Sequence, residues 1–123
     1  MRIGLISYEY PQETGFGGIG TYVHQAAQML AERGHEVDVF AGAVDQTKVE
    51  YDGSVKIHRA FPKAGAAFHQ AIAPLFQESH LKQPFEILEG PEFNADLLSI
   101  QQQFPALPQV VKLHKPTFLL QEL

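Results

Sequence analysis

The sequence predicts an α/β domain with a mostly parallel sheet, on three observations. Short apolar segments alternate along the chain with segments whose apolar residues recur every three to four positions. This alternation of strand and helix patterns is typical of βαβ units. Several strand segments are apolar almost throughout, which indicates a sheet covered by helices on both faces. The 123 residues are enough for one domain, which we expect to span residues 1–123.

The strand segments differ in pattern. Four of them predict parallel strands of one sheet: residues 2–7, 37–41, 85–89 and 109–114. Residues 49–51 and 55–58 alternate in polarity around Asp52 and Gly53, which predicts a hairpin or a strand with an excursion.

Helical spacing of apolar residues predicts a helix over residues 19–33 and another over residues 64–81. Pro74 should kink or split the second helix, because proline lacks the N–H that an internal helical residue donates. Asn94 is suited to cap a third helix.

The loop between the first strand and the first helix carries the strongest functional signal. It ends in the cluster Gly15, Gly17, Gly18 and Gly20, directly at the start of the helix. Glycines let a ligand approach the backbone closely, and the free N–H groups of a helix N-terminus favour anions. We therefore expect a site for a phosphorylated ligand.

The glycines formally match the dinucleotide fingerprint G-x-G-x-x-G, but two details oppose that interpretation. Gly15 comes eight positions after Ser7, whereas the first fingerprint glycine turns directly off the strand. Ala41 and Gly42 stand where the fingerprint needs an acid for a ribose hydroxyl. A Walker loop is excluded as well, because Thr21 rather than lysine follows Gly20.

Composition narrows the class of protein further. A net charge of −5 argues against nucleic acid as a partner. No apolar run approaches the ~20 residues that a transmembrane helix needs. The absence of cysteine excludes disulfides, thiol catalysis and thiolate metal sites, and it agrees with a reducing cytoplasm, where we expect the protein.

Polar side chains follow three of the predicted strands at their carboxyl ends, namely Glu9, Glu89 and His114. Ligands of open α/β sheets bind outside the carboxyl ends of the strands. Glu9 either hydrogen-bonds an acceptor hydroxyl or is a solvated loop acid. Glu89 either orients the acceptor or caps the following turn. His114 either contacts the ligand or packs at the strand end.

The chain resembles retaining glycosyltransferases of family four. The resemblance rests on the following segments: residues 2–7, Tyr10–Pro11, Gly17–Val23, Leu30–Val37, Phe85–Glu92 and Val111–His114. It covers nearly the whole chain and implies the amino-terminal domain of a GT-B fold, which consists of two Rossmann-like three-layer domains. It also implies transfer of a sugar from a nucleotide-sugar donor to an acceptor hydroxyl with retention of the anomeric configuration.

The resemblance implies roles for individual residues. Gly17 and Gly18 would lie beside the donor diphosphate and sugar, and His114 would face the transferred sugar as the catalytic candidate. The acceptor, a sugar or a lipid-linked sugar, would lie mainly against this domain. No cofactor is implied. We expect no metal site, because such relatives work without a bound metal and no Asp-x-Asp pair is present.

The resemblance also implies a second domain that holds the nucleotide. We therefore expect residues 1–123 to be a truncated form that is inactive alone. We expect no nucleic acid among the partners. We expect no transmembrane segment, which is compatible with peripheral contact with a membrane surface. The exposed edge of the last strand favours a homodimer. Two alternatives stay open: a nucleotide- or dinucleotide-binding oxidoreductase domain, and a non-catalytic binding module of the same fold.

Overall fold

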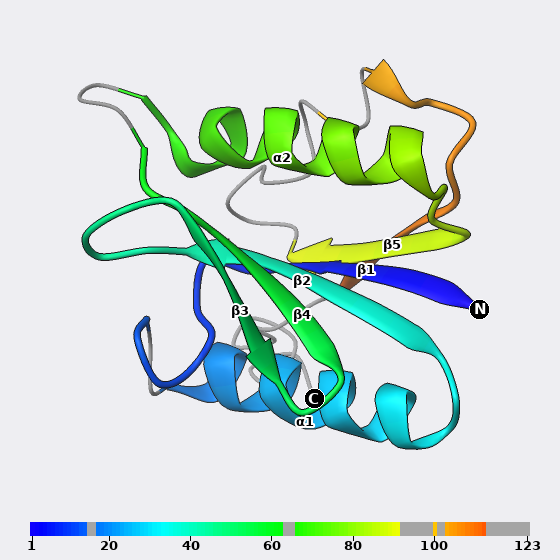
Figure 1. The fold of residues 1–123 in the computed structure, drawn as a ribbon, viewed down its shortest axis with the longest axis horizontal. Coiled ribbons are helices and arrows are strands. Elements are labelled where there is room, and N and C mark those ends of the chain that lie inside the picture. The colour runs from blue at the N-terminus through cyan, green and yellow to red at the C-terminus, as the bar shows by residue number, and fades with distance from the viewer. Residues whose placement is uncertain (15–16, 63–65, 92–99, 101–102, 113–123) are drawn as a thin grey trace, which may run out of the picture.

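A computed structural model describes residues 1–14, 17–62, 66–91, 100 and 103–112. Its elements, in chain order, are β1 (Arg2–Ile6), α1 (Gly18–Glu32), β2 (Glu36–Gly42), β3 (Lys48–Asp52), β4 (Val55–Ala60), α2 (Phe68–Lys82), β5 (Ile87–Pro91) and β6 (Gln109–Lys112). The strands form one sheet in the order β3-β4-β2-β1-β5-β6. Figure 1 shows α1 on one face of this sheet and α2 on the other.

The predicted fold class is confirmed, because every strand pair is parallel except β3–β4. The antiparallel β3–β4 pair is the hairpin that the alternation around Gly53 suggested. The strand order reverses between β1 and β5: β2 and β4 follow on one side of β1, and β5 and β6 lie on the other. The carboxyl ends of β1 and β5 therefore mark the point where a ligand site is expected.

Strand β5 begins at Ile87, so the predicted start at residue 85 was wrong. The reason is that the Phe85 N–H is donated to His80 Nδ1, at 3.0 Å, and not to a neighbouring strand. The end predicted for the last strand, residues 113–114, lies outside the described residues, as does the helix start predicted at Asn94.

Helix α2 runs from Phe68 to Lys82 and passes through Pro74 without a break, so of the two expected effects of Pro74, a kink or a split, the split does not occur. Pro74 and Gln70 both lie on the exposed side of α2. The Gln70 carbonyl, which would have bonded to an N–H at position 74, can therefore be hydrated by solvent, and the loss of that bond is tolerated. The beginning predicted at residue 64 falls within the segment 63–65, outside the described residues.

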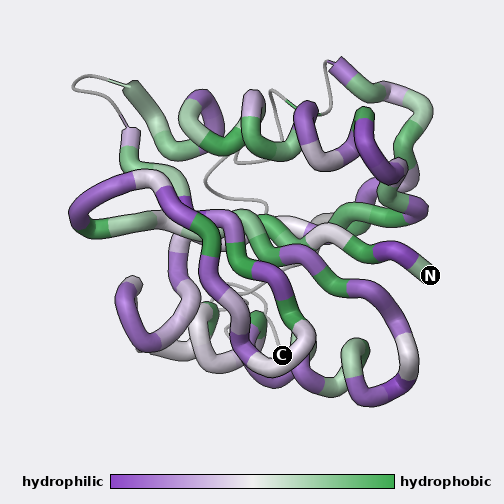
Figure 2. The backbone as a smooth tube through the Cα atoms, viewed as in Figure 1, coloured by the Kyte–Doolittle hydropathy of each residue, from purple (hydrophilic) through white to green (hydrophobic). Residues whose placement is uncertain are grey.

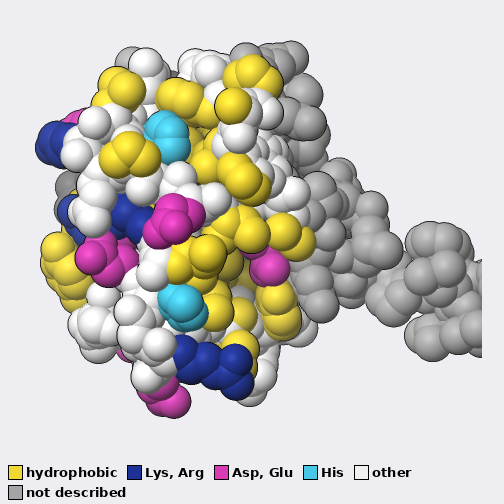
Figure 3. All heavy atoms as spheres, turned by 90° about the vertical axis from the view of Figure 1, so that its right-hand side faces the viewer, with side chains coloured by type: hydrophobic (Ala, Val, Ile, Leu, Met, Phe, Trp, Pro, Cys, Tyr) yellow, Lys and Arg dark blue, Asp and Glu magenta, His cyan; other side chains and the backbone are white. Residues whose placement is uncertain are grey.

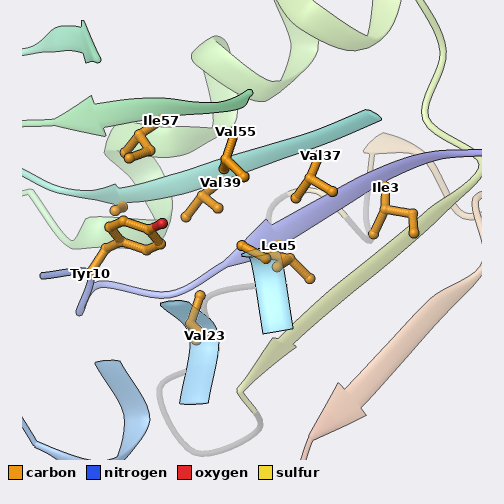
Figure 4. Packing of buried hydrophobic residues seen from close by; sticks show 10 residues of the cluster. Ile3, Leu5, Tyr10, Val23, Val37, Val39, Val55 and Ile57 are labelled. Carbon is orange, nitrogen blue, oxygen red and sulfur yellow. The ribbon is translucent and has the colours of Figure 1, made fainter. Parts of the chain in front are cut away.

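Two apolar clusters hold the three layers together. Residues at alternate positions of β1, β2 and β4 pack under α1, together with Tyr10, Val23 and Ala27 (Figure 4). The residues between them point to the other face, where Ile6 and Phe40 pack against Ile72 and Phe76 of α2. Both faces of the central strands are thus buried, which is why these strands read as nearly continuous apolar runs. Figure 2 shows this hydrophobic layer between the helices.

No helix in the described part of the chain has the length and apolar character required to cross a bilayer.

Candidate functional site

The amino-terminal end of α1 lies at the carboxyl edge of the sheet, after β1. Gly17 is its N-cap with an extended backbone, no side chain caps the helix from this position, and its first turn holds no acidic residue. A Cβ added at Gly18 would meet no heavy atom of the described residues within 4 Å. Packing within the described chain therefore does not explain glycine at position 18, and a ligand could approach the backbone there.

Glu9 supplies the negative charge that the first turn of α1 lacks. Its Oε1 accepts a hydrogen bond from the Gly20 N–H at 3.2 Å. A Cβ at Gly17 would lie 3.7 Å from the same oxygen. Glu9 is therefore not a freely solvated loop acid: its carboxylate lies at the positive end of the helix, where an anion is favoured.

Glu89 approaches α1 from the other side of the switch point. It pairs with Leu5 of β1 in the sheet, and its Oε2 accepts a hydrogen bond from the Tyr22 hydroxyl at 3.0 Å. Burial, together with this hydrogen bond and the charge of Glu89, raises the pKa of Tyr22 to about 12. Tyr22 lies one turn after Gly18, so Glu9 and Glu89 both contact the first two turns of α1.

The course of the first loop is set by hydrogen bonds within residues 8–14. The Tyr10 N–H donates to Thr14 Oγ1 at 3.0 Å, and the Thr14 hydroxyl donates to the Tyr8 carbonyl at 2.7 Å. The Thr14 N–H donates back to the Tyr10 carbonyl at 3.2 Å. The guanidinium of Arg59 also reaches this loop, although the sequence analysis did not identify Arg59 as a site residue.

Tyr8 forms an aromatic wall beside the loop, at the carboxyl edge. A Cβ at Gly42 would overlap the Tyr8 ring, so the Tyr8 ring packs in this position because residue 42 is glycine. The Tyr8 ring also packs edge-to-face against Phe68, with ring centres 5.4 Å apart. Tyr8 keeps 41% of its surface exposed, and Phe61 after β4 keeps 47%. The sequence analysis missed both aromatic residues as part of this edge.

A histidine on α1 links this helix to the hairpin. His24 Nε2 lies 3.1 Å from Asp52 Oδ2, and the Tyr10 hydroxyl donates to the same oxygen at 2.7 Å. Burial first, and then the bond to Asp52, raises the pKa of Tyr10. This cluster anchors the first loop to α1 and β3 on the side away from the glycines.

The opposite edge of the sheet is also polar. Asp38 is buried between Arg2 and His58, with His58 Nε2 at 2.7 Å from Oδ2 and Arg2 NH1 at 3.1 Å from Oδ1. These groups lie at a cavity of about 560 Å³. Figure 3, which views the molecule from this end, shows charged and histidine side chains among hydrophobic ones. Both carboxylate oxygens of Asp38 therefore have a partner, Arg2 for Oδ1 and His58 for Oδ2.

The structure brings Glu9, Gly17, Gly18 and Glu89 to the amino-terminal end of α1. The fifth predicted site residue, His114, lies outside the described residues. In the described part of the chain, no three histidine, aspartate or glutamate side chains are grouped as metal ligands.

An α/β domain with a glycine-lined helix end at the switch point is a Rossmann-like domain, a class that includes dinucleotide-binding domains as well as the domains of the GT-B fold. Residues 16–119 match the family model described as Glycosyltransferase Family 4. The chain therefore belongs to glycosyltransferase family 4. This membership favours glycosyl transfer over the oxidoreductase alternative.

Similar proteins agree with this assignment. A segment of 42 residues is 50% identical to the MMP alpha-(1->4)-mannosyltransferase of Mycolicibacterium hassiacum, covering 34% of this chain and 10% of that protein. A structure of sucrose-phosphate synthase from Thermosynechococcus elongatus matches with a TM-score of 0.71 and 17% identity, over 99% of this chain and 35% of that one. A second structure of that synthase gives a TM-score of 0.61 at 16% identity, over 98% of this chain and 68% of that one. The structural matches show a shared fold.

Proposed function

We propose that the chain is the acceptor-side domain of a retaining glycosyltransferase, which transfers a sugar from a nucleotide-sugar donor to a hydroxyl of a sugar or lipid-linked acceptor. The observation that carries the proposal is the open, glycine-lined end of α1 at the switch point, with Glu9 and Glu89 held against its first two turns. Family membership supplies the reaction class.

The donor would approach α1 at Gly17 and Gly18. The open space at Gly18 supports this, and so does the partial positive charge of the helix terminus. Glu89 would accept a hydrogen bond from an acceptor hydroxyl, because an ionised carboxylate has several acceptor sites and the Tyr22 hydroxyl donates to Oε2. His114 would face the transferred sugar, where an imidazole suits hydrogen bonding near neutral pH.

The domain would need a second, nucleotide-sugar-binding domain to act. The sucrose-phosphate synthase that shares the fold is longer, since this chain covers 35% of it. We therefore expect residues 1–123 alone to lack transferase activity and to bind nucleotide-sugars poorly. The cytoplasmic location expected from the cysteine-free sequence stays a prediction.

The test compares two forms of the protein: residues 1–123, and the same chain extended by the sequence that follows it in its gene. Each is incubated with a panel of nucleotide-sugars and sugar acceptors, and released nucleotide and glycosylated product are measured. We expect turnover from the extended form only. Gly18→Asp should abolish it, because the change places a side chain and a negative charge where the diphosphate must approach.

Ser54→Asp is the matched control, because it adds the same charge at an exposed position of the hairpin. Transfer by residues 1–123 alone, or full activity of Gly18→Asp, would contradict the proposal. Saturable NADH binding would favour the dinucleotide alternative.

We also propose that the chain forms a homodimer through β6, the outermost strand on its side of the described sheet. An unpaired strand edge is a template for pairing with a second chain. Sedimentation over a concentration series tests this, and a strictly monomeric chain at about 100 µM would contradict it.

A further inference from the structure

Arg59 is the most deeply buried charged residue at the carboxyl edge, with 1% of its surface exposed. It lies on β4, near the end of the strand, and its guanidinium points into the first loop. NH2 donates to the Tyr10 carbonyl at 3.0 Å, and NH1 donates to Thr14 Oγ1 at 3.1 Å and to the Gly42 carbonyl at 2.9 Å.

The charge of Arg59 is compensated from the neighbouring strand. Its Nε donates to Glu50 Oε2 of β3 at 2.9 Å. A buried guanidinium is tolerated only when paired and fully hydrogen-bonded, so the loop oxygens and Glu50 are together what keeps it in place. Its planar fork of donors fits one arrangement of acceptors, which a lysine ammonium would not reproduce.

Two of the oxygens that accept from Arg59, the Tyr10 carbonyl and Thr14 Oγ1, belong to the first loop. Tyr10 directly follows Glu9, and Thr14 precedes the N-cap Gly17 by three positions. We propose that Arg59 is a positioning residue, which fixes the path of residues 10–14 and thereby holds the Glu9 carboxylate on the Gly20 N–H of α1. Its importance for sugar transfer rests on the function proposed above, but the positioning itself does not.

Hydrogen exchange of individual amides, measured by NMR on the 123-residue chain, tests the inference. Four amides report on the loop. The Tyr10 amide donates to Thr14 Oγ1, and the Thr14 amide donates to the Tyr10 carbonyl. The Gly20 amide donates to Glu9 Oε1, and the Gly42 amide donates to the Tyr8 carbonyl. In Arg59→Met we expect the exchange of these four amides to accelerate by about tenfold or more relative to strand amides, as loss of hydrogen bonds to a charged group would produce. Arg59→Lys, which keeps the charge without the fork, should give a smaller change in the same amides.

A spectroscopic readout separates positioning from general stabilisation. The chemical shift of the Gly20 amide reports on its hydrogen bond to Glu9 Oε1, and Glu9→Ala, which removes the acceptor, gives the shift of the broken bond. We expect Arg59→Met to move the Gly20 amide shift toward the value in Glu9→Ala. Arg2→Met is the matched control: it removes the half-buried arginine of the opposite edge and should leave the Gly20 amide shift unchanged.

Equal acceleration of loop and strand amides in both Arg59 variants would overturn the inference, as would a Gly20 amide shift that keeps its wild-type value in Arg59→Met. Failure of both variants to fold would also overturn it, since the role would then be global. An extended protein without any transferase activity would count against the proposed function and leave the exchange result standing.

Discussion

The two edges of the sheet each contain an arginine network, and the two networks hold different kinds of structure. At the carboxyl edge, Arg59 donates to the Tyr10 carbonyl and Thr14 Oγ1 of the first loop. It also donates to the Gly42 carbonyl of β2 and to the Glu50 carboxylate of β3. Arg2, at the amino edge, pairs with the buried Asp38, donates to the Gln83 carbonyl at 2.8 Å and lies over the Phe85 ring at 4.1 Å.

The difference lies in what each guanidinium orders. Arg2 joins the starts of β1 and β2 to the short connection between α2 and β5, and the elements on both sides of that connection are already held by regular hydrogen bonds and apolar packing. Arg59 instead donates to groups of an irregular loop, the Tyr10 carbonyl and Thr14 Oγ1, so the path of that loop depends on it. A charge that pairs within regular elements can be replaced at a moderate cost in stability, whereas a charge that is bonded to an irregular loop also sets the path of that loop.

The largest expected effect is on stability when Arg59 is removed. Arg59→Met removes the guanidinium from the Gly42 and Tyr10 carbonyls, from Thr14 Oγ1 and from Glu50, although the Tyr10 carbonyl keeps the Thr14 N–H and Glu50 keeps Lys48 at 3.7 Å. Hydrogen bonds to a charged group contribute about 1.5–3 kcal/mol each, so we expect the free energy of unfolding to fall by about 3 kcal/mol or more. Urea denaturation measures this loss of stability. A loss smaller than that of Asp38→Asn at the amino edge would contradict the expected difference between the two edges.

Removing the charge at the amino edge should cost less. In Asp38→Asn the side chain keeps its shape, and Arg2 retains the Gln83 carbonyl and the Phe85 ring. We expect a loss of about 2 kcal/mol, in the range for one charged hydrogen-bonded partner. Amide exchange at Tyr10 and Gly20 should be unchanged in this variant; accelerated exchange there would show that the two edges are coupled.

The periodic parts of the structure could be predicted from the sequence. Helix α1, predicted at 19–33, occupies Gly18–Glu32, because its apolar spacing and the glycines around it define both ends. The polar residues after β1 and β5 could be predicted as site positions, because parallel strands place their carboxyl ends at one edge of the sheet.

The partners of the site residues could not be predicted in the same way. Tyr22 reads as a core residue, and its bond to Glu89 exists only because β1 lies next to β5. Arg59 comes directly after the predicted strand segment 55–58, although β4 extends to Ala60, and a charge at a strand end is typical of a solvent-facing position. Its acceptors come from segments up to 49 positions away, a distance that no local pattern reports.

Gly42 tests the packing of the carboxyl edge. In Gly42→Ala the new Cβ would overlap the Tyr8 ring, and overpacking of this kind costs about 1–3 kcal/mol. We expect a loss near the lower end, because Tyr8 is partly exposed and can move outward. In Tyr8→Ala the same Gly42→Ala change should cost little, which a double-mutant cycle in urea denaturation measures. If Gly42→Ala costs the same in the wild type and in Tyr8→Ala, the contact with the Tyr8 ring is not the cause of the loss.

The smallest expected effect is a dependence of stability on pH that belongs to the amino edge. Burial first, and then the charge of Arg2, lowers the pKa of His80, and neutral His80 Nδ1 accepts the Phe85 N–H. The folded protein therefore binds this proton less readily than the unfolded chain. The contribution of His80 is fully present above its ordinary pKa of 6.5 and declines as the pH falls below it. The loss should stay within the ~1 kcal/mol of one hydrogen bond.

We expect His80→Gln to remove this component from the pH profile of urea denaturation, while His69→Gln, also on α2, leaves it in place. Identical pH profiles for the wild type and His80→Gln would show that protonation of His80 does not break the bond to Phe85, and that the amino edge carries no acid sensitivity through this residue.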